Sequence, residues 1–227
     1  MIHLKAVLFI LATFTITTTN AQDRYTVRLS GNMGGGQSFG TRLGAGVRTK
    51  SDISTLCLLT AGYTFSKLRI SAGLGLSGTV YSKTYQVLFE SDFDPVTGLP
   101  KSEPTEMTIT SVYRYLVFPV TIGGMLPVTR KLTIVPEFGL LPAYNQRVIV
   151  KNENHKAGKT TSYKNAPATT FSLAGMVAVN AEYYLTKRAG LTAGISYTQT
   201  VTNLESAPNS GRYERTYGAG IGVIFKL

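Results

Sequence analysis

One segment of the chain contains Gly73-x-Gly75-x-x-Gly78, the glycine spacing of a dinucleotide-binding turn. In such a turn a strand ends and the third glycine begins a helix, whose N-terminus binds the pyrophosphate. Here apolar residues alternate with small or polar ones, and Thr79-Val-Tyr81 continues the alternation. The pattern therefore predicts a β-strand that contains the glycines, and it does not predict a nucleotide site.

Metal and nucleophile chemistry have few candidate residues. Beyond residue 21 the chain has one histidine, His155, and one cysteine, Cys57. A zinc site requires three or four His, Cys or carboxylate ligands, which these two residues cannot supply. A barrel enzyme that modifies lipid would need a histidine with a serine and an acid near the membrane, and His155 keeps this alternative open. No metal or cofactor site is predicted, and Cys57 is interpreted as a small apolar side chain on a strand.

Two acidic residues, Glu137 and Glu182, lie in segments that otherwise alternate between apolar and small residues. Two carboxyl groups could act as a general acid and a general base. Neither a positioned nucleophile nor an aromatic platform for a sugar accompanies them in the sequence. A carboxylate inside a protein is costly unless a cation pairs with it, so ion pairs are favoured over catalysis.

The N-terminal residues predict a secretory signal peptide over 1–21. They contain Lys5, an apolar run over 6–16 and small residues up to Ala21. The apolar run is shorter than the roughly 20 residues that a membrane-spanning helix needs. Residues 22–227 are then expected to form one domain, because no linker-like segment divides them.

The chain without its signal is strongly basic. The signal removes one of 23 Lys and Arg residues, so 22 basic and 12 acidic residues remain and the formal charge is +10. Such an excess favours nucleic acid or an anionic membrane as a partner, and export argues against nucleic acid. A single cysteine excludes an internal disulfide, so stability must come from strand hydrogen bonds and burial.

The dominant period of the sequence is two, the period of β-strands. Short and long polar breaks alternate along the chain, as in barrels with tight turns on one rim and extended loops on the other. Eight strands are predicted, at about 39–50, 54–66, 67–89, 107–126, 131–150, 168–185, 189–202 and 213–227. Residues 24–33 also alternate and are an alternative first strand, either alone or joined to 39–50 through a bulge at Gly34-Gly-Gly36.

We therefore expect an all-β fold, a closed, antiparallel, up-and-down transmembrane β-barrel of about eight strands. One side of each strand carries large apolar residues, and the other carries mainly Gly, Ser, Thr, Glu and Arg. A soluble carrier would place the large side chains inside, where about eight strands leave little room. If the large side chains face lipid instead, the apolar side of each strand contacts hydrocarbon and the polar side lines the lumen. Tyr63, Phe65, Tyr183 and Phe225 then lie near strand ends, as in an interfacial girdle of aromatic residues. The inward glycines are expected to let opposite walls approach each other.

The same alternation sends Glu137 and Glu182 into the lumen near the tight-turn rim, together with Arg69. Arg42 joins them if 39–50 is the first strand. Because buried carboxylates need cationic partners, we predict a lumenal ionic cluster of these four residues that links two strands to the facing wall.

Two polar stretches between predicted strands have opposite charge, a net +4 in 145–167 and a net −4 in 90–106. The basic stretch could contact the acidic one or bind anionic lipopolysaccharide, or both could be solvated loops whose charges are screened beyond roughly 8 to 10 Å. The candidate surface-binding residues are Arg147, Lys151, Lys156, Lys159 and Lys164.

Three features resemble the small outer-membrane β-barrel domain proteins of Gram-negative bacteria, the PorT-like group. They are a signal ending in Ala-Gln, the run Arg114-Tyr-Leu-Val-Phe-Pro119-Val-Thr-Ile, which is similar to a Tyr-Leu-x-Ile-Pro strand of that group, and a glycine-rich C-terminal strand ending Phe225-Lys-Leu227. The resemblance covers nearly all the exported chain, although the final Leu227 replaces the aromatic residue that is commoner for barrel assembly. It implies an outer-membrane location and contact with the barrel-assembly machinery, and some members assist protein secretion. Pro119 is expected to point inward and to interrupt strand pairing.

These observations predict a monomeric, non-enzymatic outer-membrane protein whose outer loops bind a partner, or whose barrel acts as a scaffold or secretion accessory. A lumen filled by side chains argues against bulk transport. A lipid-modifying barrel enzyme and a soluble secreted ligand-binding barrel are the alternatives.

Overall fold

The computed structural model describes residues 24–40, 48–49, 52–87, 94–100, 105–154, 158–165, 171–202 and 212–227. The predicted signal peptide lies outside these ranges, as do Arg42, His155 and Lys156. No helix in the described part of the chain is long and apolar enough to cross a membrane.

The described residues form twelve β-strands. In chain order they are β1 (Tyr25–Gly40), β2 (Arg48–Thr49), β3 (Asp52–Phe65), β4 (Leu68–Val87), β5 (Thr105–Val117), β6 (Val120–Gly124), β7 (Leu126–Pro127), β8 (Leu132–Asn154), β9 (Lys159–Asn165), β10 (Phe171–Tyr184), β11 (Ala189–Thr200) and β12 (Arg212–Lys226).

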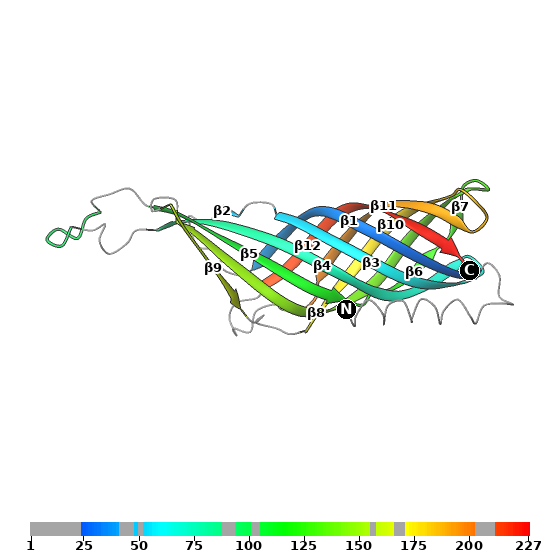
Figure 1. Cartoon of the computed structure of the whole chain (residues 1–227), viewed down its shortest axis with the longest axis horizontal. Coiled ribbons are helices and arrows are strands. Elements are labelled where there is room, and N and C mark those ends of the chain that lie inside the picture. The colour runs from blue at the N-terminus through cyan, green and yellow to red at the C-terminus, as the bar shows by residue number, and fades with distance from the viewer. Residues whose placement is uncertain are drawn as a thin grey trace.

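The strands close into a ring of eight positions, which confirms the predicted barrel (Figure 1). Going around the ring, β1 pairs with β3, β3 with β4, β8 with β10, β10 with β11, β11 with β12, and β12 with β1. Both β5 and β6 lie between β4 and β8, so together they occupy a single position. All of these pairs are antiparallel. Because the order of strands closes on itself, every barrel strand has neighbours on both sides.

The first strand of the ring is β1, an extended form of the alternative 24–33 segment. Its register with β12 runs without a shift from Thr26 opposite Lys226 to Gly40 opposite Arg212, so no bulge interrupts it at Gly34-Gly-Gly36. Within 39–50, the described pair Arg48–Thr49 forms only the short strand β2 against the far end of β4. The choice of 39–50 as the first strand is therefore wrong.

The expected strand at 107–126 is interrupted at Pro119, as predicted. Its pieces are β5, β6 and β7, and the ladder is interrupted where the proline has no N–H to donate. Phe118 N–H donates to the Pro142 carbonyl at 2.8 Å, and Gly73 N–H donates to the Pro119 carbonyl at 3.0 Å. Pro119 itself is among the most buried side chains. The break therefore interrupts the strand locally, while β5 and β6 keep the same register against β4 and β8 and the wall stays closed.

The ring strands β4, β5 and β8 extend beyond the ring at the end opposite the tight turns, where β2 pairs with β4 and β9 pairs with β8 (Figure 1). The pairing of β8 with β10 stops at Tyr144 opposite Phe171, and β8 then continues between β5 and β9 to Asn154. The polar stretch 151–167, expected as a loop, thus forms largely strand, with β9 folded back on β8. The register of β8 shifts opposite Arg114 and Tyr115, where the two strands enter this protruding sheet.

Alternation along each strand separates an apolar outside from a mainly polar inside, as expected. Ile221 and Leu76 are 75% and 59% exposed, whereas Arg69 is 2% exposed. In the half of the barrel farther from the tight turns, the interior also contains a small apolar core formed by Leu58, Tyr115, Val117 and Ala143. The inside of this barrel is therefore filled by side chains.

The inward glycines have a different role from the expected one. A Cβ at Gly73 would lie 2.2 Å from the Leu59 carbonyl oxygen, and one at Gly222 would lie 2.3 Å from the Leu29 carbonyl oxygen. Both oxygens belong to the adjacent strand in the ring. The glycines therefore permit close approach between neighbouring, strongly coiled strands, and the contact is not between opposite walls.

Replacing Gly75 with alanine is expected to destabilise the barrel by about 1–3 kcal/mol. The new Cβ would lie 2.4 Å from the Cys57 carbonyl oxygen, which is backbone and cannot move aside alone. Urea unfolding of the protein in micelles, followed by its gel mobility without boiling, would measure the loss. Gly31→Ala is the matched control, because a Cβ at Gly31 would meet no atom within 4 Å; equal effects of the two changes would contradict the steric explanation.

Candidate functional site

Four charged side chains meet inside the barrel, and each comes from a different strand. Arg28 lies on β1, Arg69 on β4, Glu137 on β8 and Glu182 on β10. On every strand the alternation directs the charged residue to the side opposite the large apolar residues. We call these four residues the lumenal ionic cluster.

Glu137 is the centre of the cluster. Arg28 binds it with two parallel hydrogen bonds, Nη1 to Oε1 at 2.8 Å and Nη2 to Oε2 at 2.9 Å. Arg69 Nη2 donates to Oε1 at 3.1 Å, and Asn180 Nδ2 donates to Oε2 at 3.0 Å. The two-pronged arrangement is the strongest form of an arginine–carboxylate contact, since it fixes geometry as well as charge.

Glu182 completes the network. Arg69 donates to it through Nη1 at 3.1 Å and also through Nη2, and the Tyr184 hydroxyl donates to its Oε2 at 3.0 Å. Glu137 and Glu182 are 1% and 0% exposed, so both carboxylates lie away from bulk solvent. The two arginines balance the two carboxylates in formal charge, which is the condition for tolerating them in a buried place.

The cluster spans the lumen. In the ring of eight, β1 and β8 are four positions apart, so the Arg28–Glu137 contact joins opposite walls. The contact of Arg69 with Glu182 joins walls three positions apart. At this level the interior is therefore occupied by a cross-connected layer of side chains.

The chemistry available to the carboxylates is limited by these partners. Each of the four carboxylate oxygens of Glu137 and Glu182 accepts at least one hydrogen bond from an arginine. A general base needs an oxygen free to take a proton from a substrate. The arrangement instead suits a structural role, because it holds the walls at a fixed separation.

The structure brings together three of the four predicted members of the cluster and adds one. Glu137, Glu182 and Arg69 meet, whereas Arg42 lies outside the described residues. Arg28 occupies the predicted position of the second arginine, because 24–33 belongs to the first strand. The alternation of Arg24, Thr26 and Arg28 against apolar neighbours was the signal that could have identified it.

A second polar contact lies farther from the tight turns. The Tyr115 hydroxyl donates to both carboxylate oxygens of Glu214, at 3.3 and 3.2 Å. The Glu214 N–H donates to the Thr200 hydroxyl at 2.6 Å. Tyr115 also stacks on Tyr113, with ring centroids 6.3 Å apart. Tyr115, Thr200 and Glu214 border a lumenal cavity of about 70 Å³, too small for bulk passage.

The candidate surface-binding residues do not form a single cluster. Lys151 and Lys164 share one face of the protruding sheet, because Lys164 is opposite Ile149 and Lys151 follows it by two residues. Lys159 is opposite Asn154 and therefore lies on the other face. All three lysines are exposed, Arg147 is on β8 opposite Arg114, and Lys156 is outside the described ranges.

The sequence also offered candidates for metal, thiol and histidine chemistry. Within the described ranges, no three His, Cys, Asp or Glu side chains are grouped so that they could hold a metal ion. Cys57 is an exposed free thiol on β3. His155, the residue of the lipid-enzyme alternative, lies outside the described residues.

The outside of the barrel has two levels of aromatic side chains with aliphatic residues between them. Tyr217 and Phe225 on β12 are eight residues apart with Ile221 between them, and Phe171 and Tyr183 on β10 are twelve apart, all exposed. At about 3.3 Å per residue and a tilt of roughly 40°, these spacings correspond to about 20 and 30 Å of height. An eight-stranded ring with this outer band and an ionic interior has the architecture of a transmembrane β-barrel.

Comparisons with known proteins found similar solved structures but no family. No family model matches the sequence, and no curated protein matches it. Among solved structures, the chain is similar to Neisserial surface protein A (TM-score 0.44, 16% identity, covering 92% of this chain and 100% of that one). It is also similar to the outer membrane protease OmpT from Escherichia coli (TM-score 0.47, 10% identity, 94% and 100%) and to Ail, the attachment invasion locus protein of Yersinia pestis, solved with a heparin analogue (TM-score 0.36, 12% identity, 90% and 100%). These neighbours are small outer-membrane β-barrel proteins, and at these scores the similarity does not extend to function.

Proposed function

We propose that this chain is an integral outer-membrane β-barrel protein of the PorT-like group, with a non-enzymatic role as a surface-binding or scaffold barrel. The observation that carries this proposal is the combination of an exposed apolar outer face with the lumenal ionic cluster. The first suits lipid around the ring, and in the second, arginines from facing walls bind every carboxylate oxygen of Glu137 and Glu182.

The protruding sheet supports a binding role at the surface. The strands β4, β5, β8 and β9 extend beyond the apolar band, and they present Lys151 and Lys164 on one face. Cations on a rigid sheet attract anionic groups without the ordering cost of a flexible loop. Lipopolysaccharide or an acidic protein surface are partners with the required charge.

Spin labels test the direction of the apolar face. Labels at Leu74 and Ile221 are expected to report lipid, and labels at Ser77 and Thr216, which border the lumenal cavity, are expected to report a protein-packed interior, measured as accessibility to oxygen and to a water-soluble relaxant. The folded protein should also be found in the membrane fraction and migrate differently on a gel before and after boiling. Partition into the aqueous phase after carbonate washing would instead indicate a soluble ligand-binding barrel.

A binding assay tests the surface role. The double variant Lys151→Gln/Lys164→Gln is expected to weaken binding to immobilised lipopolysaccharide about tenfold, since each cation near an anionic surface contributes about 1 kcal/mol and part of this is screened by salt. The matched control is Lys83→Gln/Lys159→Gln, because Lys83 shares with Lys159 the face of the sheet that continues the lumen. Equal loss in both variants would contradict a defined binding face.

A third measurement tests the alternative that the barrel is an enzyme that modifies lipid. If the barrel modifies lipid, His155→Ala should abolish the modification when the purified protein is incubated with lipopolysaccharide and the products are analysed by mass spectrometry. We expect no modification by either form. A product that is lost in the variant would contradict the non-enzymatic proposal.

A further inference from the structure

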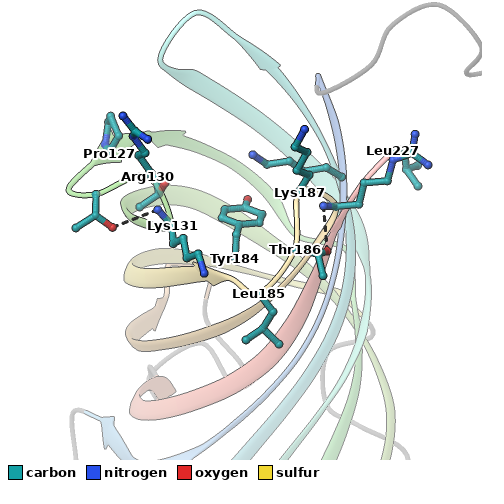
Figure 2. Close-up of a pocket in the computed structure, with 12 residues that line it drawn as sticks. Pro127, Arg130, Lys131, Tyr184, Leu185, Thr186, Lys187 and Leu227 are labelled. Atoms are coloured by element: carbon teal, nitrogen blue, oxygen red, sulfur yellow. Dashed lines mark hydrogen bonds between the residues drawn. The ribbon is translucent and has the colours of Figure 1, made fainter.

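The tight-turn rim carries a group of cations that the lumenal ionic cluster does not use. They surround a cavity of about 950 Å³ between the β7–β8 connection, the β10–β11 connection and the end of β12 (Figure 2). The cations that line it are Arg130, Lys131, Lys187, Arg188 and Lys226. None of the described residues that line this cavity has an acidic side chain. We call it the rim cavity.

The two connections hold their cations in the same local structure. In Thr129-Arg-Lys131, the threonine hydroxyl accepts backbone N–H bonds from Lys131 and from the following residue, at 3.2 and 3.0 Å. In Thr186-Lys-Arg188, the threonine hydroxyl accepts the equivalent bonds at 3.2 and 2.9 Å. Such threonine turns fix the backbone, so each connection presents its basic pair in a defined position.

The residues that line the rim cavity include side chains from both the inside and the outside of the barrel. The two connections are neighbours, because the Tyr184 N–H donates to the Lys131 carbonyl at 2.8 Å. The inward side chain of Tyr184 lines the cavity, and so does Leu185, which points outward and is 57% exposed. The rim cavity is therefore bordered by both an inward and an exposed outward side chain.

The surroundings of the cavity point to an amphiphilic ligand. The cations begin just beyond the aromatic level that contains Tyr183 and Phe225, which is the height of lipid headgroups in a transmembrane barrel. Exposed apolar side chains, Leu126, Val128 and Leu185, flank them. An acidic peptide would use the cations but leave these apolar side chains uncovered, whereas a lipid contacts both.

We propose that the rim cavity binds the phosphate headgroup of an anionic phospholipid in the inner leaflet, with the acyl chains lying against the adjacent apolar residues. This proposal rests on the proposed membrane location. The shared chemistry is a phosphate group, which a free phosphate ester could also supply, so the test separates the two sources.

The experiment measures lipid binding by native mass spectrometry of the whole protein released from detergent, after insertion has been verified by the gel shift. Phosphatidylglycerol is the anionic probe, and phosphatidylcholine is the zwitterionic one. The test variant is Arg130→Gln/Lys187→Gln/Arg188→Gln, and the control Lys83→Gln/Arg114→Gln/Lys159→Gln removes the same charge at the other end of the barrel, from residues without a proposed binding role. Thr129→Val/Thr186→Val keeps every cation and disturbs only the turns.

We expect the original chain to bind phosphatidylglycerol at least tenfold more tightly than phosphatidylcholine. The rim variant should lose that preference, the threonine variant should lose part of it, and the control should change it less than twofold. Equal binding of both lipids, or equal loss in the rim and control variants, would overturn the proposal. So would displacement of the lipid by an equal concentration of glycerol phosphate or of an acidic peptide. If the protein does not insert at all, the proposed membrane location itself is wrong.

Discussion

Glu137→Gln is expected to lower the free energy of unfolding of the barrel by roughly 3–5 kcal/mol, because it leaves buried arginines without a full complement of negative charge. Arg28 loses its only carboxylate partner among the described contacts, and Arg69 loses one of two. Urea titration in micelles, with the unboiled gel shift as the measure of folded protein, would give the difference. Glu106→Gln is the matched control, since Glu106 is an exposed residue on β5.

A double substitution distinguishes electrostatics from simple loss of shape. In Arg28→Leu/Glu137→Leu the remaining Arg69 and Glu182 still balance each other, so we expect part of the stability to return relative to Glu137→Gln. If the double variant is instead less stable than the single one, the cluster stabilises mainly through packing. A change of less than about 1 kcal/mol in Glu137→Gln would show that water enters the lumen and hydrates the charges.

The second large effect is expected on the outside of the ring. Ile221→Arg places a charge in the middle of the apolar band, and such charges cost about 2–4 kcal/mol near the midplane of a transmembrane barrel. Ile221 is 75% exposed, so in a water-soluble barrel the same change would be close to neutral. Folding yield into lipid vesicles and the urea midpoint of the inserted protein measure the cost.

The control for this substitution is Val96→Arg. Val96 is 90% exposed and lies in a described turn outside the barrel strands, where Asp94 accepts backbone hydrogen bonds from Val96 and Thr97. An arginine there should leave insertion and stability unchanged. If Ile221→Arg is also neutral, the outer face does not contact lipid, and the proposed location fails with it.

Much of the fold could be predicted from the sequence because strand alternation is strict. Once the large apolar side was assigned to the outside, Glu137, Glu182 and Arg69 had to point inward, and the short turns placed them at one height. Their meeting then followed from the cost of burying an unpaired charge. Three members of the cluster could therefore be predicted without knowing which strands lie opposite each other.

The remaining features could not be predicted from strand alternation alone. Residues 24–33 and 39–50 both have acceptable patterns, so Arg28 could be identified only after the pairing of β1 with β12 and β3 was known. The polar composition of 151–167 indicated a loop, but polar residues also form strands where both faces of a sheet meet water. The role of the glycines depends on the coiling of neighbouring strands, and the sequence alone does not specify it.

The pairing of β1 with β12 has a consequence for how the protein matures. The first and last strands are neighbours, and the three arginine–glutamate contacts of the cluster join residues 68, 109 and 113 positions apart. Such a topology cannot form piece by piece as the chain emerges, and contacts between distant residues make folding slow. If the chain is exported as proposed, it crosses an aqueous compartment with its apolar side chains uncovered before the last strand pairs, and we expect it to depend on a chaperone that delays aggregation.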